Sequence, residues 1–257
     1  VFCSFVIIHL APYYAYVVEF CVFTVKTLAE KVTYLVFYHI FFIMLAWSYG
    51  MTIFKRPATQ SKEFNLSDND QDQFVNQKKQ DFLQDVLQYI AKDLPISTVS
   101  KKGNIRYCHK CNLIMPDRCH HCSACNKCVL KQDHHCFLVN NCVGFSNYKY
   151  YKTTSTGLPF WTKELPYTHA KNSILYMVGG NAVFLIFALP KFIYHCWLIG
   201  KNRTTKENFK PPCFRNVPKN SGFSLGLSKN VKEVFGEEKK YWILPVYTSK
   251  GDGCSFP

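Results

Sequence analysis

Cysteine and histidine are concentrated between residues 108 and 142, which hold eight of the 13 cysteines and five of the nine histidines. Within this stretch the pattern C-x2-C-x9-H-x6-C occurs twice, and the second copy begins 14 residues after the first. A tetrahedral zinc site takes four Cys or His ligands, and a C-x2-C pair often supplies two of them. The repeat therefore predicts two structural zinc ions, each closed by four ligands. The two ligand sets are Cys108, Cys111, His121 and Cys128, and Cys122, Cys125, His135 and Cys142.

Disulfide bonds are the alternative explanation for so many cysteines. Disulfides need no histidine, whereas His121 and His135 keep the register of the repeat, so zinc is favoured. The ladder of cysteines from Cys119 to Cys128 also allows other ligand groupings, so the exact pairing stays open. Cys119 belongs to neither set and has no adjacent acid, and we expect it to be a small buried residue or a spare thiol. Free thiols and zinc ligands at this density indicate a reducing compartment, hence the cytosolic side of a membrane.

A third copy of the repeat would begin at Cys136. Its other ligand positions are occupied by Val139, Lys149 and Thr156, none of which can serve as a zinc ligand here. Cys136 is therefore left without a role as a ligand, between two residues that have one. A thiol becomes a nucleophile when a base accepts its proton and a carboxylate orients that base. Asp133, His134 and Cys136 supply these three groups within four residues, which makes them the candidate catalytic residues.

The motif Asp133-His134-His135-Cys136 inside this Cys/His frame resembles the DHHC family of zinc-containing protein S-acyltransferases (palmitoyltransferases), and the similarity extends to residues 251–257 (GDGCSFP). The resemblance implies a two-step transfer. Cys136 takes a long-chain acyl group from palmitoyl-CoA or another acyl-CoA, with His134 accepting the proton and Asp133 orienting it, and passes the group to a cysteine of a substrate protein. The implied partners are a membrane, acyl-CoA and substrate proteins with membrane-proximal cysteines.

Two tail segments also resemble family motifs. Thr204–Glu207 matches Thr-Thr-x-Glu, which implies a contact between Thr205 and Asp133, although the residues alone read equally well as a helix capping box. Asn230 belongs to an element whose Asn supports the fold. The chain departs from the family where Phe137-Leu138 replaces Pro-Trp. That departure and the absent helix described below leave an alternative function open, namely a catalytically impaired, zinc-stapled membrane scaffold.

The elements that must position these residues are apolar segments. Residues 1–25 and 34–54 are each long enough to span a bilayer. A cleaved signal peptide is the alternative for the first, but it has no basic leader and no initiating Met, so we expect the sequence to be truncated at its start. Residues 173–199 form the last span. The family has a third helix directly after Ser146–Lys149, whereas residues 143–172 contain no apolar run long enough for one.

The predicted fold is mostly α, a polytopic helical membrane protein with a cytosolic, zinc-stapled, small-sheet cysteine-rich domain and three visible spans. The expected parts are a hairpin of two transmembrane helices (1–54), a cytosolic linker with an amphipathic helix at roughly 70–92 (55–107), the cysteine-rich domain (108–152), a remnant of the third-helix region (153–172), the last transmembrane helix (173–199) and a cytosolic tail (200–257).

Positive charge predicts that the regions after the second and last spans are both cytosolic. One crossing cannot join two points on the same side, so either a helix has been lost, which we favour, or the tail lies on the opposite side, or the final segment is re-entrant. We expect a multi-pass protein of the Golgi, endoplasmic reticulum or plasma membrane.

The formal net charge of +14 indicates an anionic partner. Nucleic acid is disfavoured by the apolar spans and by the absence of a DNA-reading finger spacing, which leaves an anionic membrane face or a phosphate-bearing ligand. Four lysines near the cluster are candidates for the CoA phosphates, although each reads as well as an ordinary solubilising residue. They are Lys127, Lys131, Lys149 and Lys152.

Overall fold

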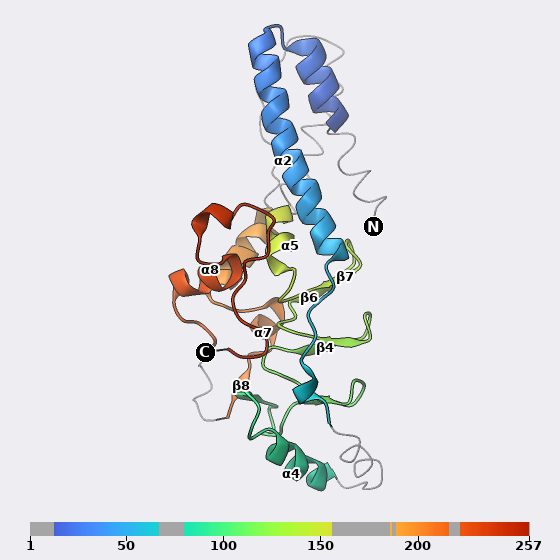
Figure 1. The fold of residues 1–257 in the computed structure, drawn as a ribbon, viewed down its shortest axis with the longest axis vertical. Helices are drawn as coiled ribbons and strands as arrows, with labels where there is room; N and C mark the ends of the chain where they lie inside the picture. The colour runs from blue at the N-terminus through green and yellow to red at the C-terminus, as the bar shows by residue number, and fades with distance from the viewer. Residues whose placement is uncertain (1–12, 67–79, 156–185, 187–188, 216–221, 257) are drawn as a thin grey trace.

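The computed structural model describes residues 13–66, 80–155, 186, 189–215 and 222–256 (Figure 1). A long helix, α2 (Leu28–Phe54), projects from a smaller body of short strands and helices (Figure 1). Among the residues described, α2 is the helix long and apolar enough to cross a membrane by its length and composition. The described part of the chain is therefore mostly helical, with one long apolar helix and a cysteine-rich domain of small sheets.

Over residues 1–54, where a hairpin of two transmembrane helices is expected, the structure describes η1 (Ala15–Thr24) lying beside α2. The two helices meet through aromatic rings, with Tyr16 stacked on Tyr38 at 4.5 Å between ring centroids. Helix α2 begins six residues earlier than the predicted span. Residues 28–31 (LAEK) are good helix formers, and the hydroxyl of Thr27 donates to Glu30 at 2.6 Å at this helix start.

The cysteine-rich domain consists of three antiparallel hairpins with one register. The pairs are β2–β3 (Tyr107–Cys108 with Leu113–Ile114), β4–β5 (His120–Cys122 with Lys127–Val129) and β6–β7 (His134–Cys136 with Asn141–Val143). Each hairpin has an Asn in the left-handed region, which Asn tolerates better than most residues. These are Asn112, Asn126 and Asn140, with φ of 51°, 49° and 47°. The 14-residue repeat is thus a repeat of backbone conformation as well as of ligands.

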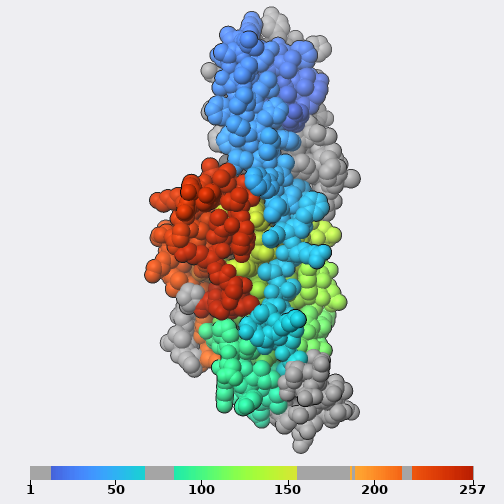
Figure 2. Space-filling view, in the orientation of Figure 1, coloured from blue at the N-terminus to red at the C-terminus, as the bar shows by residue number. Residues whose placement is uncertain are grey.

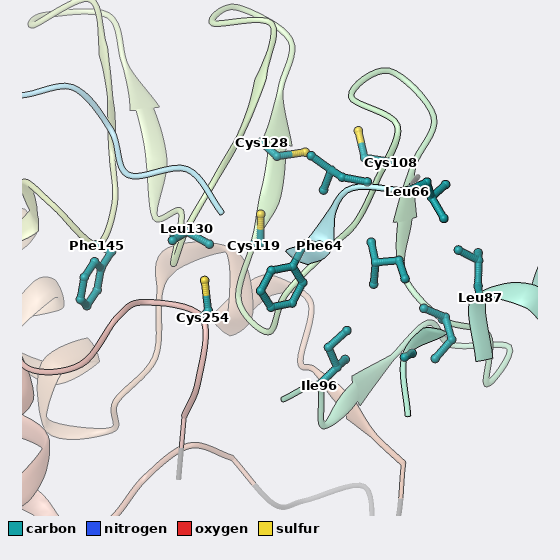
Figure 3. Close-up of a cluster of buried hydrophobic side chains, with 14 residues drawn as sticks. Phe64, Leu66, Leu87, Ile96, Cys108, Cys119, Cys128, Leu130, Phe145 and Cys254 are labelled. Carbon is teal, nitrogen blue, oxygen red and sulfur yellow. The ribbon is translucent and has the colours of Figure 1, made fainter. Parts of the chain in front are cut away.

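One hydrophobic cluster joins the linker, the zinc hairpins and the C-terminus (Figure 3). Phe64, at the end of η2 (Lys62–Phe64), is fully buried beside Leu87 of α4 (Gln80–Ile90) and Cys254 of the tail. Helix α4 lies within the amphipathic helix predicted at 70–92, and residues 67–79 fall outside the described part. Cys119 is fully buried in the same cluster, as expected for a small buried residue.

The tail packs against the cysteine-rich domain. It contains α7 (Thr205–Phe209), β8 (Cys213–Phe214), α8 (Leu227–Phe235) and η3 (Lys239–Tyr241), and β8 pairs with β1 (Thr98–Val99) of the linker. In the space-filling view, the red tail lies against the blue end of α2 and the cyan linker (Figure 2). Asn230 is buried, and its amide donates to the carbonyl of Gly200 at 2.8 Å. This bond ties α8 to the end of the helix formed by residues 189–200.

Helix α5 (Tyr148–Ser155) follows the cysteine-rich domain and packs against α2. The start of the expected third helix is therefore present as two helical turns, where the polar sequence suggested that this helix was absent. Residues 156–185 lie outside the described part. Residues 189–200 are helical and fall at the end of the predicted last span, whose remaining residues, apart from 186, are not described.

Candidate active site and zinc sites

The structure brings the four residues of each predicted ligand set together. In both sets the four ligand atoms lie within 4.8 Å of one another. The first set joins β2–β3 to β4–β5, and the second joins β4–β5 to β6–β7, because the sets overlap in sequence. Two ions would therefore link the three hairpins into one unit.

The distances inside each set fit zinc. With Zn–S near 2.3 Å and Zn–N near 2.0 Å, the S–N edge of a tetrahedron is about 3.6 Å. The Nδ1 atom of His121 lies 3.5, 3.3 and 3.9 Å from its three sulfurs, and Nδ1 of His135 lies 3.6, 3.4 and 3.7 Å from its three. Each set offers four ligands, so a bound zinc would act as a structural staple with no open position.

A residue outside the ligand sets supports the second site. Gln132 is 1% exposed, and its amide nitrogen lies 3.2 Å from the sulfur of Cys142. Its amide oxygen accepts from Lys206 of α7 at 2.5 Å. Donors of this kind orient metal ligands and stabilise a thiolate. Helix α7 is therefore linked through one side chain to the second zinc site.

Cys136 occupies the place of a zinc ligand in a hairpin that has no metal set of its own. In the first two hairpins, Cys108 pairs with Leu113 and Cys122 with Lys127, and both cysteines belong to ligand sets. In the third, Cys136 pairs with Asn141 in the same register. The thiol is thus held by a hairpin that the second zinc site fixes on both strands, while its own sulfur is left over for chemistry.

The structure brings Asp133 and His134 together beside this thiol. Nδ1 of His134 lies 2.7 Å from Oδ2 of Asp133, which leaves Nε2 as the nitrogen for proton exchange. Asp133 is fully buried, and its carboxylate also accepts from the backbone N–H and hydroxyl of Thr205 at 2.8 and 2.9 Å. The contact implied between Thr205 and Asp133 is present, and the tail therefore completes the site.

The electrostatic environment favours the charged form of all three groups. Burial alone would raise the pKa of the Cys136 thiol, but His134 and the backbone N–H groups of Val139 and Leu138 lower it below its ordinary value. Burial alone would lower the pKa of His134, but Asp133 and Cys136 raise it to about 9. Burial opposes ionisation of Asp133 as well, yet His134 and Thr205 hold its pKa below the usual range. The arrangement thus favours transfer of the thiol proton to the imidazole.

Comparison with known proteins identifies the family of this chain. The DHHC palmitoyltransferase family model matches residues 101–212. Palmitoyltransferase ZDHHC20 of Homo sapiens is 50% identical over 275 residues, which cover 100% of this chain and 75% of that protein. Palmitoyltransferase ZDHHC2 of Danio rerio is 47% identical over 261 residues, covering 95% of this chain and 72% of the relative. The chain belongs to the DHHC palmitoyltransferase family. As a protein S-palmitoyltransferase it uses acyl-CoA and protein substrates, and proteins of this family are membrane proteins.

The segment Thr204–Glu207 is both a family motif and a capping box. The hydroxyl of Thr204 accepts from the N–H of Glu207, and the carboxylate of Glu207 accepts from the N–H of Thr204. Glu207 also forms a two-point ion pair with Arg118, at 2.7 and 2.8 Å. Arg118 is 2% exposed, and its guanidinium lies 4.7 and 5.0 Å from the ring centroids of Phe223 and Phe256. The cap therefore anchors α7 on the cysteine-rich domain, which sets the position of Thr205.

The prediction that lysines near the DHHC motif meet CoA phosphates is wrong for three of them. Lys131 forms an ion pair with Glu233 at 2.6 Å, and burial lowers its pKa to about 8. Lys149 and Lys152 are almost fully buried. Lys149 donates to the carbonyl of Tyr241 in the tail and Lys152 to the carbonyl of Phe192, at 2.7 Å each. The partners lie far away in sequence, so residue spacing gave no sign of them. Lys127 remains a prediction.

Phe137 and Leu138, which replace the family's Pro-Trp, are exposed. The turn after Cys136 is closed by the N–H of Asn140, which donates to the carbonyl of Phe137 at 3.3 Å. The departure from the DHHC pattern therefore lies at the surface beside the thiol, and the hairpin keeps the register of its two neighbours.

Sequence reasoning missed two groups around the DHHC hairpin. Asn141 donates to three carbonyls at the end of α2. His195 lies on the helix formed by residues 189–200, and the centroid of its ring is 6.1 Å from that of His134. The only available signal for His195 was a histidine within an apolar span, where polar groups are rare and usually have a partner. For Asn141, no spacing relates it to α2, which ends almost 90 residues earlier.

Proposed function

We propose that this chain transfers a long-chain acyl group from acyl-CoA to cysteines of substrate proteins through an acyl-Cys136 intermediate. Asp133, His134 and Cys136 are assigned the catalytic roles. The single observation that carries this assignment is the buried chain of contacts from Thr205 through Asp133 to His134, beside a thiol left outside both zinc sets.

In the first step, His134 accepts the proton of Cys136, and the thiolate sulfur attacks the carbonyl carbon of the thioester. A new S–C bond forms at Cys136 and the bond between the acyl carbon and the CoA sulfur breaks. The imidazolium of His134 returns the proton to the departing CoA thiolate. Asp133 orients the ring through Nδ1 and stabilises its positive charge.

In the second step, the thiol of a substrate cysteine loses its proton to His134 and attacks the acyl group on Cys136. The new thioester forms on the substrate, and the sulfur of Cys136 departs and regains a proton. One thioester replaces another in each step, so the exchange is close to isoenergetic. The enzyme therefore mainly needs a nucleophile, a base and fixed geometry.

We propose that each Cys3His set holds one zinc ion in a structural role. The eight ligands are Cys108, Cys111, His121 and Cys128, and Cys122, Cys125, His135 and Cys142. The second set places a ligand directly before Cys136 and another opposite His135 in the hairpin, so its metal would limit the movement of the nucleophile.

We propose a polytopic topology in which the cysteine-rich domain and the tail share the cytosolic side of a Golgi, endoplasmic reticulum or plasma membrane. The ion pair of Arg118 with Glu207 and the contact of Thr205 with Asp133 support a common side, because they join the two regions directly. Substrates would then be proteins whose cysteines lie close to the membrane. The domain boundaries given above follow from this topology.

A shortened third-helix region is part of this proposal. The alignment with human ZDHHC20 runs over 275 residues, whereas the chain has 257, so about 18 positions of the relative have no counterpart here. That difference is close to the length of one transmembrane helix. Retention of α5 supports an active chain, because α5 supplies Tyr151, whose ring packs against that of His134.

The test uses the full chain purified in detergent with a fluorescent long-chain acyl-CoA. We expect a hydroxylamine-sensitive label on the wild type, no label on Cys136→Ser, and normal labelling of the control Cys213→Ser, whose cysteine lies in β8. A label that persists in Cys136→Ser would reject the assignment of the nucleophile. A wild type without any such label would reject transferase activity for this chain and favour a scaffold.

A further inference from the structure

Three aromatic side chains next to His134 have no role in the proposed reaction. The ring of Tyr151 meets that of His134 edge-on, with centroids 5.1 Å apart and planes at 69°. The ring of His195 lies 6.1 Å from His134 and 5.6 Å from Tyr151. Tyr148 completes the group, because its hydroxyl lies 3.0 Å from Nδ1 of His195. Two helices therefore contribute rings beside the imidazole of His134, α5 through Tyr151 and residues 189–200 through His195, and Tyr148 of α5 holds His195.

A single hydrogen bond does not fix the plane of an imidazole. The bond from His134 to Asp133 holds one ring nitrogen, and the ring torsion of histidine is broad. The plane matters because Nε2 must point at the sulfur of Cys136. Contacts with the faces and edges of the ring supply the missing restraint, and Tyr151 and His195 provide them.

His195 is itself held by polar and aromatic contacts. It is 4% exposed, and a buried polar ring is unfavourable unless it is hydrogen-bonded. The hydroxyl of Tyr148 is its hydrogen-bond partner, and the ring of Tyr151 packs against it at 73°. A leucine would fill this place without a polar partner, so a hydrogen-bonded ring indicates that orientation is needed here as well as volume.

We propose that His195 is a positioning residue for acyl transfer. Its hydrogen bond with Tyr148 fixes its ring, and that ring holds the plane of His134 so that Nε2 faces Cys136. His195 acts through His134 and not on the acyl group. This inference rests on the proposed function. It means that α5 and the helix of residues 189–200 help to position the catalytic imidazole.

The test compares single and double variants of the full chain by acylation from fluorescent palmitoyl-CoA. His195→Phe keeps a flat ring but loses Nδ1, and Tyr148→Phe loses only the hydroxyl. Loss of one net hydrogen bond predicts a fall in kcat of about fivefold for each, with KM for palmitoyl-CoA unchanged. Because both changes remove the same bond, the double variant should be no slower than the slower single variant. His195→Asn keeps an acceptor for the hydroxyl of Tyr148 but loses the ring that packs against His134, so it should be at least as slow as His195→Phe.

A matched control is Tyr194→Phe, which likewise removes one tyrosine hydroxyl, here from the helix of residues 189–200. That hydroxyl accepts from Asn208 at 3.1 Å, and its loss should leave kcat unchanged. Rates are normalised to the burst amplitude, so that a smaller folded fraction does not mimic a slower step. If His195→Phe does not fold, Tyr148→Phe alone decides the question.

Rates of the His195 and Tyr148 variants within about twofold of wild type would overturn the inference, as would additive effects in the double variant. Loss of the label in Cys136→Ser would then show that the proposed function stands while His195 has no positioning role. A label that remains in Cys136→Ser would show instead that the proposed function has failed.

Discussion

The side-chain amide of Asn141 connects the β6–β7 hairpin to the end of the long apolar helix α2. Its Nδ2 lies 3.1, 3.0 and 3.0 Å from the carbonyl oxygens of Thr52, Ile53 and Lys55. The last carbonyls of a helix have no partner within the helix, so this amide caps the end of α2. Since Asn141 pairs with Cys136 across the hairpin, the cap also determines where Cys136 lies relative to that end.

Substitution of Asn141 by Asp removes the donors and keeps the size of the side chain. An amide NH2 has two hydrogens, so about two net hydrogen bonds of about 1 kcal/mol each are lost. The carboxylate would then face three carbonyl oxygens with no hydrogen between them, and this repulsion in a partly buried place adds about 2 kcal/mol. The oxygen that accepts from the N–H of Cys142 at 2.9 Å is retained. We therefore expect a loss of about 4 kcal/mol, or a midpoint lower by about 8–16 °C for a chain of this size.

The assay is thermal unfolding of the detergent-purified full chain, followed by tryptophan fluorescence. Asn140→Asp is the matched control, because Asn140 is exposed at the adjacent position with φ of 47° and Asp tolerates that conformation. The control should unfold within about 2 °C of wild type, since exposed substitutions rarely exceed about 0.5 kcal/mol. If Asn141→Asp unfolds as the control does, the amide does not carry the connection between the hairpin and α2.

Three further predictions concern the tail and the metal sites. Thr205→Val removes the hydroxyl that donates to Asp133 and keeps the backbone N–H, so single-turnover acylation should slow by about tenfold, and an unchanged rate would exclude a role for this hydroxyl. Glu207→Gln leaves the buried guanidinium of Arg118 without its main countercharge and should lower the free energy of unfolding by about 3 kcal/mol in a denaturant titration. The exposed change Glu238→Gln, which also removes an ion pair, should have little effect, and equal losses in the two variants would contradict the argument from burial. Elemental analysis should give two zinc ions per chain, and a chelator that removes them should abolish acylation; one zinc per chain would contradict the repeat.

The ligand sets could be predicted from sequence because they depend on local spacing. Each hairpin brings together residues close in sequence, and the same C-x2-C pair and register recur after 14 residues. The contact of Thr205 with Asp133 was available only through the resemblance to a family, since 72 residues separate the two. From the residues alone, Thr204–Glu207 could only be predicted to start a helix, which it also does.

The contacts that the sequence did not reveal join distant segments. Lys131 appeared to be a free surface charge, but its partner Glu233 lies 102 residues away. Nothing in the sequence singles out Arg118, yet it is buried against two rings of the tail and paired with Glu207. A lysine or arginine in sequence looks the same whether it is solvated or buried with a partner. Only the folded chain distinguishes the two cases.

The position of Cys136 follows from the repeat that provides the zinc ligands. Cys108 and Cys122 occupy the same hairpin position, and each belongs to a complete set. At Cys136 the position is kept but the rest of the set is absent, so the sulfur has no metal to share its charge. The two strands of its hairpin, β6 and β7, still carry His135 and Cys142, which belong to the second ligand set. The third hairpin therefore keeps the backbone register of the two ligand-bearing hairpins and holds at that position a thiol that belongs to neither ligand set.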